Sequence, residues 1–275
     1  MKKDHTMTTE KKGQVLDLPL TMERRSFLKK VAAGSLSAAV LMVYRPFSNA
    51  ENEPSEDLVP VAEPEKKKPN YAYVIDTNKC IGAGDCVKAC STENDVPAGM
   101  FRTWVERYII TDEGVHVDSP NGSTEGFPKP TPKVEENSKR AYFVPKLCNQ
   151  CRDAPCIQVC PVGATFQIEE GFVLMDYDHC IGCSACIQGC PYGVRFLNPD
   201  TGTADKCDWC YHRVKRGEQP ACVTACPTGA RAFGDLNDPE SEVSKVFKQN
   251  NWMVLKPEMH TDSYVFYVEL PREVV

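Results

Sequence analysis

Residues 180–191 read CIGCSACIQGCP, a stretch with four cysteines and a proline directly after the last one. The spacing C-x2-C-x2-C-x3-C-P is typical of bacterial ferredoxins. In such a run three closely spaced thiolates hold one iron–sulfur cluster, and the fourth reaches across to a neighbouring cluster. The stretch therefore predicts iron–sulfur clusters that are bound in pairs.

Related runs lie on both sides of this stretch, and the four runs together contain all 15 cysteines of the chain. In chain order they are Cys80, Cys86 and Cys90; Cys148, Cys151, Cys156 and Cys160; Cys180, Cys183, Cys186 and Cys190; and Cys207, Cys210, Cys222 and Cys226. The first run has Ala83 where a fourth cysteine would lie. The other runs end in CPVGA (160–164), CPYGV (190–194) and CPTGA (226–230). This internal repeat favours one scheme for all runs, with two ferredoxin-like units and up to four clusters.

Two other uses of cysteine compete with this interpretation. A disulfide framework is disfavoured because the number of thiols is odd, and because 275 residues with 41% hydrophobic content can bury a core without crosslinks. A structural zinc scaffold is the stronger alternative, since paired C-x2-C motifs also suit tetrahedral zinc. Zinc sites do not usually combine three close cysteines with a fourth that precedes proline, so the spacing favours iron–sulfur clusters.

Residues 1–50 are predicted to be a twin-arginine signal peptide and not part of the fold. RRSFLKK (24–30) precedes the apolar run VAAGSLSAAVLMVY (31–44), and SNA (48–50) is a candidate cleavage site. The apolar run is shorter than the ~20 residues that a membrane-spanning helix needs, although an uncleaved anchor is an alternative. Clusters are assembled in a reducing cytoplasm, so export of the folded protein fits a chain rich in thiolates. We therefore expect the protein on the periplasmic side of the inner membrane.

The rest of the chain is predicted to be a flexible linker (51–70) followed by one iron–sulfur domain (71–275). The linker contains four prolines and three successive lysines. The domain alternates short apolar strands with turns, as in ATFQI-EEG-FVLM (164–175), and we expect brief helices over each C-x3-C segment. Further strands are expected at 71–76, 103–110, 115–118 and 264–270, and a long irregular insertion at 119–140. The predicted fold class is α+β.

Charge and the remaining polar residues narrow the set of partners. Of the 32 basic and 38 acidic residues, 9 and 4 lie in residues 1–50, so the remainder carries a net charge of −11. This charge disfavours nucleic acid and anionic membrane surfaces as partners. No later stretch is apolar for ~18 residues, so membrane attachment after processing has to come through a partner. His116, His179, His212 and His260 are expected to be surface or packing residues, and Arg102, Arg107, Arg195 and Arg213 are candidates to offset cluster charge.

These motifs resemble a known family. The four runs, the insertion after the first, and the segments KCDWCYHRVKRGEQPACVTACPTGARAFGDL (206–236) and VLKPEMHTD (254–262) are similar to the four-cluster electron-transfer subunits of the dimethyl sulfoxide and polysulfide reductase type. The resemblance covers about residues 71–270. It implies one ferredoxin-like unit made by the first and fourth runs, and another made by the second and third runs at 142–198.

The resemblance also implies four sets of cluster ligands. They are Cys148, Cys151, Cys156 and Cys190; Cys180, Cys183, Cys186 and Cys160; Cys207, Cys210, Cys222 and Cys90; and Cys80, Cys86 and Cys226, the last set being incomplete at Ala83. The first three sets imply 4Fe-4S clusters. The incomplete set implies a 3Fe-4S cluster, a 4Fe-4S cluster with a non-cysteine ligand such as water or Asp85, or an empty site. We expect the three-iron form, because three thiolates remain in register.

The function that the resemblance implies is electron transfer, not catalysis by this chain alone. Electrons would pass between a quinone-reactive subunit in the membrane and a redox partner such as a molybdopterin oxidoreductase. An alternative is a complex without molybdenum, in which the partner is a multihaem cytochrome or a sulfur carrier. A more distant alternative is a redox enzyme that uses an open iron site beside Ala83.

Overall fold

The computed structural model describes residues 68–274, so the predicted signal peptide (1–50) and most of the predicted linker lie outside the described residues. The strands are β1 (Tyr71–Asp76), β2 (Thr103–Thr111), β3 (Gly114–Asp118), β4 (Ser138–Leu147), β5 (Thr165–Gln167), β6 (Val173–Met175), β7 (Arg195–Leu197), β8 (Ala204–Lys206), β9 (Arg231–Asp235), β10 (Trp252–Met253) and β11 (Val265–Val268). The α-helices are α2 (Asp85–Glu93), α3 (Pro132–Glu136), α4 (Pro155–Gln158), α5 (Ala185–Gln188), α6 (Tyr211–Val214), α7 (Ala221–Thr224) and α8 (Glu242–Gln249). Three short 3-10 helices are η1 (Pro120–Ser123), η2 (Pro257–Met259) and η3 (Arg272–Val274). This mixture confirms the predicted α+β class.

The helices over the cysteine runs begin at the same place in each run. Helices α2, α4, α5 and α7 start one residue before Cys86, Cys156, Cys186 and Cys222, respectively. Proline at the first position of α4 and directly before α7 favours these starts, because its φ angle already suits a helix and it has no N–H to leave unpaired. The predicted brief helices over the C-x3-C segments are confirmed.

Three short antiparallel ladders repeat along the chain. In each ladder, the strand after a CPxG motif pairs with the strand before the next cysteine run. Thr165 pairs with Met175 in the β5–β6 ladder, and Arg195 pairs with Lys206 in the β7–β8 ladder. The third ladder joins the end of the domain to its beginning, because Arg231 of β9 pairs with Ile75 of β1. The repeat therefore closes on itself.

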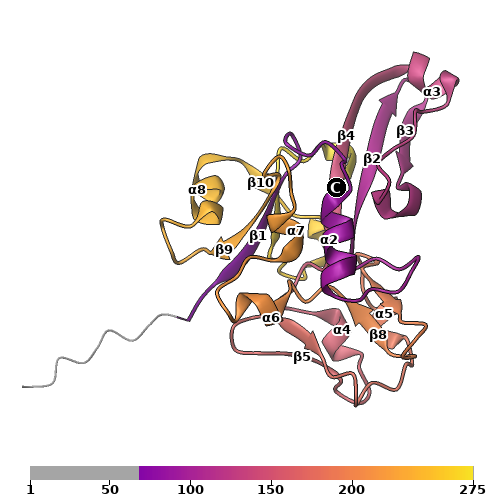
Figure 1. Cartoon of the computed structure of the whole chain (residues 1–275). Coiled ribbons are helices and arrows are strands. Elements are labelled where there is room, and N and C mark those ends of the chain that lie inside the picture. The colour runs from indigo at the N-terminus through magenta and orange to yellow at the C-terminus, as the bar shows by residue number, and fades with distance from the viewer. Residues whose placement is uncertain (1–67, 275) are drawn as a thin grey trace, which may run out of the picture. The chain divides into compact units, whose positions relative to one another are not determined.

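The sheet built around β1 has the order β10-β11-β1-β9, with β11 parallel to β1 and β9 antiparallel to it. Helix α8 covers one face of this sheet, where Val243 packs with Ala72 and Phe266. The Ser241 side chain accepts a hydrogen bond from the Ser244 backbone N–H at the start of α8, which satisfies a free helix-end donor. In Figure 1, α8 lies beside β9 and β10, away from β2–β4.

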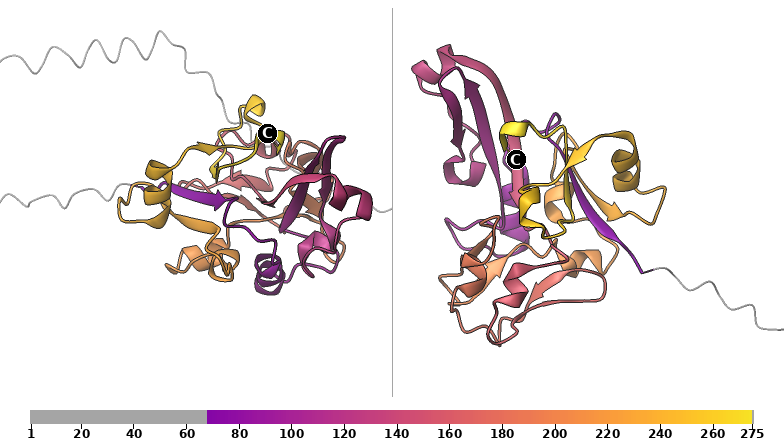
Figure 2. Two further views of the ribbon diagram at one scale, coloured as in Figure 1. Left: turned by 90° about the horizontal axis from the view of Figure 1, so that it is seen from above. Right: turned by 180° about the vertical axis from the view of Figure 1, so that it is seen from behind.

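A separate sheet with the order β3-β2-β4 occupies the segment between the first and second cysteine runs. Its three strands lie side by side and extend away from the helices of the cysteine runs in both Figure 1 and Figure 2. The expected irregular insertion at 119–140 instead contains η1, α3 and the first residues of β4. Ser138, Lys139 and Arg140 are exposed, so they lack the apolar alternation by which a strand is predicted.

Aromatic side chains fill the space between the β1 sheet and the cysteine runs. The ring centroids of Trp209 and Phe233 are 5.5 Å apart, and those of Trp209 and Phe172 are 6.0 Å apart. Both contacts are edge-on, a favourable geometry for aromatic pairs. Buried cysteines belong to the same core. Among residues 68–274, no helix has both the length and the apolar character needed to cross a membrane.

Candidate cluster-binding sites

Two cavities are each lined by cysteines from runs that are far apart in the sequence. The first contains Cys80, Cys86 and Cys226, so it joins the first run to the fourth. The second contains Cys148, Cys151, Cys156 and Cys190, so it joins the second run to the third. Two of the four ligand sets that the resemblance implies are thus gathered in space.

A third group of thiols lies where the first and fourth runs meet again. Burial raises the pKa of the Cys207 thiol, and the neighbouring thiols of Cys90, Cys222 and Cys210 raise it further. The Asn94 side-chain amide donates hydrogen bonds to the sulfur atoms of Cys90, at 3.6 Å, and Cys210, at 3.8 Å. These contacts bring together the set of Cys207, Cys210, Cys222 and Cys90.

The remaining four cysteines belong to the second and third runs. Cys160 follows α4, and Cys180, Cys183 and Cys186 lie before and within α5, which packs against α4. The Ala204 backbone N–H donates to the Cys180 sulfur at 3.4 Å. Cys183 is exposed, in contrast to the other cysteines. The structure places these four on neighbouring elements but shows no contact among their sulfur atoms.

Backbone N–H groups stabilise the thiolate at the end of two runs. Burial alone would raise the pKa of the Cys160 thiol, but hydrogen bonds from the backbone N–H groups of Thr165, Val162, Ala164 and Gly163 outweigh it and lower the pKa. Cys226 behaves in the same way, with donors at Thr228, Arg231 and Ala230. The turn that aims these donors contains a glycine with positive φ, 68° at Gly163 and 62° at Gly229.

Most other thiols are held in surroundings that disfavour a free thiolate. Burial raises the pKa of Cys151 to about 12 and that of Cys210 to about 11. Burial also raises the pKa of Cys90. A buried thiolate needs a positive partner, and thiolate-bound iron supplies one.

The thiol groups fit the requirements of iron–sulfur clusters. All 15 cysteines lie in the described part of the chain and none forms a disulfide, so the disulfide framework is excluded there. Grouped thiols with N–H donors aimed at sulfur match the ligands and hydrogen bonds of protein-bound clusters. Among residues 68–274, no three His, Cys, Asp or Glu side chains form a group placed for a single metal ion. A cluster holds its thiolates further apart than one ion does, because sulfides lie between the irons.

Ala83 lies in the wall of the first cavity, at the position where its run lacks a cysteine. Both of its neighbours are glycines, and a side chain would not fit at either of them. A Cβ atom on Gly84 would lie 1.9 Å from the Ser123 carbonyl oxygen, and one on Gly82 would lie 2.6 Å from the Phe143 ring. Asp85 also lines this cavity, but the residue is exposed at the start of α2.

The histidines and tryptophans occupy ordinary structural positions. His179 is exposed and its Nδ1 atom lies 2.7 Å from the Asp176 carboxylate, while His212 pairs with Glu93 at 2.7 Å. Trp209 is buried between Cys207 and Cys210, and its Nε1 donates to the Cys148 carbonyl at 3.1 Å. Trp104 donates to Glu106. Trp209 thus joins the second run to the fourth, as expected of a residue that packs beside a cluster.

The arginines divide into two groups. Arg107 pairs with Asp118, Arg213 with Glu93 and Arg102 with Asp205. Arg195 donates to the Cys156 sulfur at 2.9 Å, and Arg231, which the sequence interpretation missed, lines the first cavity together with Cys86. Arg231 follows Cys226 at the same distance as Arg195 follows Cys190. Aligning the repeats could have revealed it.

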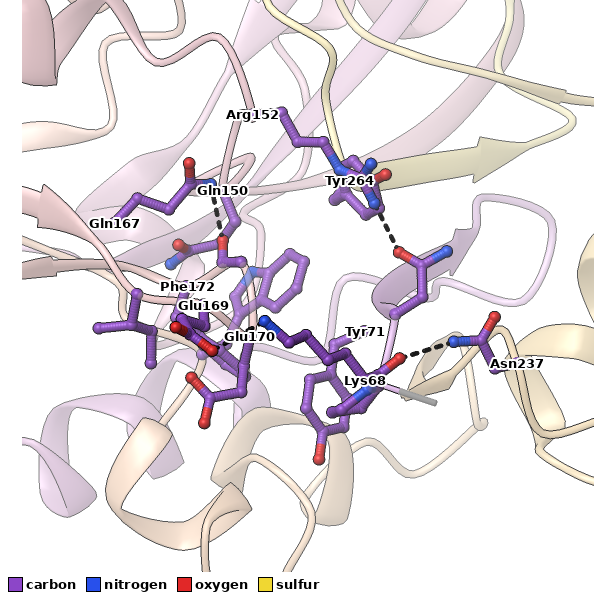
Figure 3. A pocket seen from close by; sticks show the side chains of 15 residues that line it. Lys68, Tyr71, Gln150, Arg152, Gln167, Glu169, Glu170, Phe172, Asn237 and Tyr264 are labelled. Carbon is purple, nitrogen blue, oxygen red and sulfur yellow. Dashed lines mark hydrogen bonds and ion pairs between the residues drawn. The ribbon is translucent and has the colours of Figure 1, made fainter. Parts of the chain in front are cut away.

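A larger pocket of about 520 Å³ contains no cysteine side chain (Figure 3). Gln150 and Trp209, which line it, each lie between two cysteines of a run. Gln150 donates to the Cys207 carbonyl at 3.0 Å and accepts from the Val173 N–H at 2.7 Å. Across the pocket, Arg152 stacks over the Tyr264 ring at 4.2 Å. The pocket therefore borders the junction of the second and fourth runs without entering a thiol group.

Comparisons with known proteins agree with this geometry. A family model described as a 4Fe-4S dicluster domain matches residues 139–236. The B subunit of tetrathionate reductase from Salmonella typhimurium is 40% identical over 225 residues, which cover 78% of this chain and 82% of that protein. The iron–sulfur B subunit of a putative dimethyl sulfoxide reductase from Halobacterium salinarum is 40% identical over 216 residues, covering 72% and 79%. The B chain of polysulfide reductase from Wolinella succinogenes is 35% identical over 205 residues, covering 74% and 95%.

Thiols that share a cavity are expected to serve one cluster. Replacing Cys148 or Cys190 with serine should therefore alter the same electron paramagnetic resonance signal, because both line the second cavity. Replacing Cys180 or Cys160 should alter a different signal. The control Gln158→Ala, at an exposed position of α4, should alter none. If Cys190→Ser instead alters the signal that Cys180→Ser alters, the ligands come from single runs and the sets are wrong.

Proposed function

We propose which clusters this chain binds and which partners it serves. The chain belongs to the family of iron–sulfur B subunits of the dimethyl sulfoxide and polysulfide reductase type. The chain is an electron-transfer subunit of an oxidoreductase complex and is not catalytic alone. Its function is to relay electrons between a membrane subunit and a redox partner. The observation that carries the rest of the proposal is the gathering of thiols from distant runs into shared cavities.

The proposed cluster content is two double-cluster units, one from the first and fourth runs and one from the second and third. The second cavity would hold a 4Fe-4S cluster on Cys148, Cys151, Cys156 and Cys190. The buried group of Cys207, Cys210, Cys222 and Cys90 would hold another, and Cys180, Cys183, Cys186 and Cys160 a third. When bound, such clusters take up and release single electrons. The chain's own residues bury them, exclude water and donate hydrogen bonds to sulfur.

The proposed content of the first cavity is a 3Fe-4S cluster on Cys80, Cys86 and Cys226. Three thiols line the cavity, and the methyl group of Ala83 supplies no fourth ligand. Asp85 is the nearest alternative ligand in the sequence.

The proposed partners are a quinone-reactive membrane subunit and a molybdopterin catalytic subunit, on the periplasmic side of the inner membrane. Two exposed isoleucines at equivalent repeat positions support two contact points. Ile81 follows Cys80 and is 59% exposed, and Ile181 follows Cys180 and is 64% exposed. An exposed large apolar residue beside a cluster ligand suits a surface that another subunit covers. These isoleucines mark the incomplete set and the set with the exposed Cys183.

A multihaem cytochrome or a sulfur carrier is the second candidate for the outer partner. The incomplete ligand set at Ala83 favours this candidate. An altered cluster there would lie next to the partner that binds at Ile81. The same feature supports, more distantly, an enzyme with an open iron at this site.

The three-iron proposal predicts a specific response to Ala83→Cys. The anaerobically purified wild-type protein should show an oxidised three-iron signal by electron paramagnetic resonance. The variant should lose this signal and gain about one iron atom per chain, because a fourth thiolate completes the site. Asp85→Asn is the matched control and should keep the signal. A wild-type protein without it, and with about 16 iron atoms per chain, would show four intact four-iron clusters instead.

Export by the twin-arginine route is tested by changing Arg24 and Arg25 to lysine. We expect the variant to remain in the cytoplasm with its clusters assembled, as measured by cell fractionation and visible absorbance. Lysine-to-arginine changes at Lys11 and Lys12 keep the charge outside the motif and should not affect export. Normal export of the Arg24 and Arg25 variant would contradict the proposed route.

The partners are tested by the metal content of the native complex, extracted in mild detergent and purified through a tag on this chain. Stoichiometric molybdenum or tungsten beside iron is the expected result. Iron with haem and no molybdenum or tungsten would replace the first candidate with the second. A colourless preparation that contains zinc would contradict the electron-transfer role itself.

A further inference from the structure

Two buried arginines lie at equivalent positions of the repeat. Arg195 and Arg231 follow the last cysteine of the third and fourth runs by the same number of residues and begin β7 and β9. They are 4% and 2% exposed. The equivalent residue after the second run is Thr165, which carries no charge. Each arginine also lines one of the two cysteine cavities.

Arg195 contacts sulfur and hydroxyl groups. Its guanidinium donates to Cys156 Sγ at 2.9 Å, to Thr165 Oγ1 at 3.3 Å and to Met175 Sδ at 3.3 Å. The charges that act on it are those of cysteine thiols, with Cys156 first. No carboxylate among residues 68–274 pairs with it.

Arg231 repeats this arrangement in the first cavity. Its guanidinium donates to Thr103 Oγ1 at 3.0 Å and to Tyr73 Oη at 3.5 Å, and it lines the same cavity as Cys86, the thiol on which its charge acts most, followed by Cys222. Cys86 and Cys156 are equivalent, because each is the residue after the start of its helix, α2 or α4. The described residues supply no carboxylate partner here either.

In the other two sets, no arginine or lysine of the described residues donates to a ligand sulfur, although the charge of Arg231 also acts on Cys90 and Cys222 and that of Arg195 on Cys186. Arg102 acts on Cys90, but its guanidinium is paired with Asp205 at 2.8 Å. Cys180 accepts from a backbone N–H of Ala204. Lys206 is buried near Cys156, yet its ammonium group donates to the carbonyl oxygens of Val173 and Cys207 and not to sulfur.

An unpaired guanidinium in a dry site is costly unless an anion compensates it. The thiolates of a bound cluster are the available anions at both arginines. Reduction adds one more negative charge to the cluster, and a fixed positive charge beside the ligand sulfurs favours that state. The effect on the reduction potential is greatest for the cluster whose ligands the arginine adjoins, and it is weaker for the clusters of the other unit.

We propose that Arg195 and Arg231 set the reduction potentials of the clusters on Cys156 and Cys86, each raising its cluster above the other cluster of the same unit. The proposal rests on the ligand sets given under the proposed function. It assigns a specific electrostatic role to two residues that touch cluster ligands and bind no iron themselves.

The test is a redox titration of the anaerobically purified full chain, followed by electron paramagnetic resonance. Arg195→Gln removes the charge and keeps a hydrogen-bond donor. It should lower the potential of the Cys156 cluster by at least a tenfold change in its reduction equilibrium, about 59 mV for one electron. Arg195→Lys keeps the charge and should recover most of the loss. The signals of the unit at Cys86 should keep their potentials.

Arg152→Gln is the matched control. It removes the same charge from the second run, but Arg152 stacks on Tyr264 and contacts no thiol. The cluster reduction potentials of Arg152→Gln should match those of the wild-type chain. A control variant that shifts as far as Arg195→Gln would attribute the effect to net charge and overturn the proposal.

The outcomes separate this proposal from the proposed function. Intact clusters with unshifted potentials in Arg195→Gln overturn the proposal and leave the electron-transfer role in place. A wild-type chain without iron overturns the ligand sets themselves. If Arg195→Gln loses iron, the same two substitutions at Arg231 decide. Loss of iron in both glutamine variants would show that the arginines are required for cluster assembly, and this result would overturn the proposal that they set the potentials.

Discussion

The structure depends on the burial of thiols beside one another. In water a thiolate is stabilised by solvent, but in a core it needs a bound cation, hydrogen-bond donors or a nearby positive charge. This chain combines these means around its four runs. The turns after Cys160 and Cys226 aim backbone N–H groups at sulfur, and Arg195 donates to Cys156. The local geometry of each run is thus determined by what a thiolate requires.

The same few local features recur along the whole domain. Each repeat consists of a short helix that begins just before a cysteine, a turn after CPxG and a two-stranded ladder. Because every ladder joins one run to the next, distant cysteines are brought together, and Cys86, Cys148, Cys207 and Cys222 share one hydrophobic core. The aromatic residues Tyr71, Phe172 and Phe233 then fill the space between ladders.

Much of this could be predicted from sequence, and the failures have physical causes. Cysteine spacing and period-two alternation indicated the runs and the strands β1, β2, β5 and β6. Strand β4 was not predicted, because its first four residues are exposed and lack apolar alternation, and α8 was missed because eight residues carry too short a pattern. Asn94 was missed because it acts on Cys210 across the fold, and no local pattern reveals such a contact. Arg231 was missed because the repeats have to be aligned to show that it follows Cys226 as Arg195 follows Cys190.

The closure of the repeat through β9 and β1 imposes an order on the making of the protein. Strand β1 leaves the ribosome before the other strands of the domain, yet both its neighbours, β9 and β11, come from the last part of the chain. Cys80 and Cys86 are likewise synthesised long before Cys226, which lines the same cavity. Cys148, Cys151 and Cys156 are followed much sooner by Cys190, which shares theirs. All the cysteines of the second cavity are therefore synthesised before the last cysteine of the first cavity, so the ligands of the site beside Ala83 are the later ones to become complete.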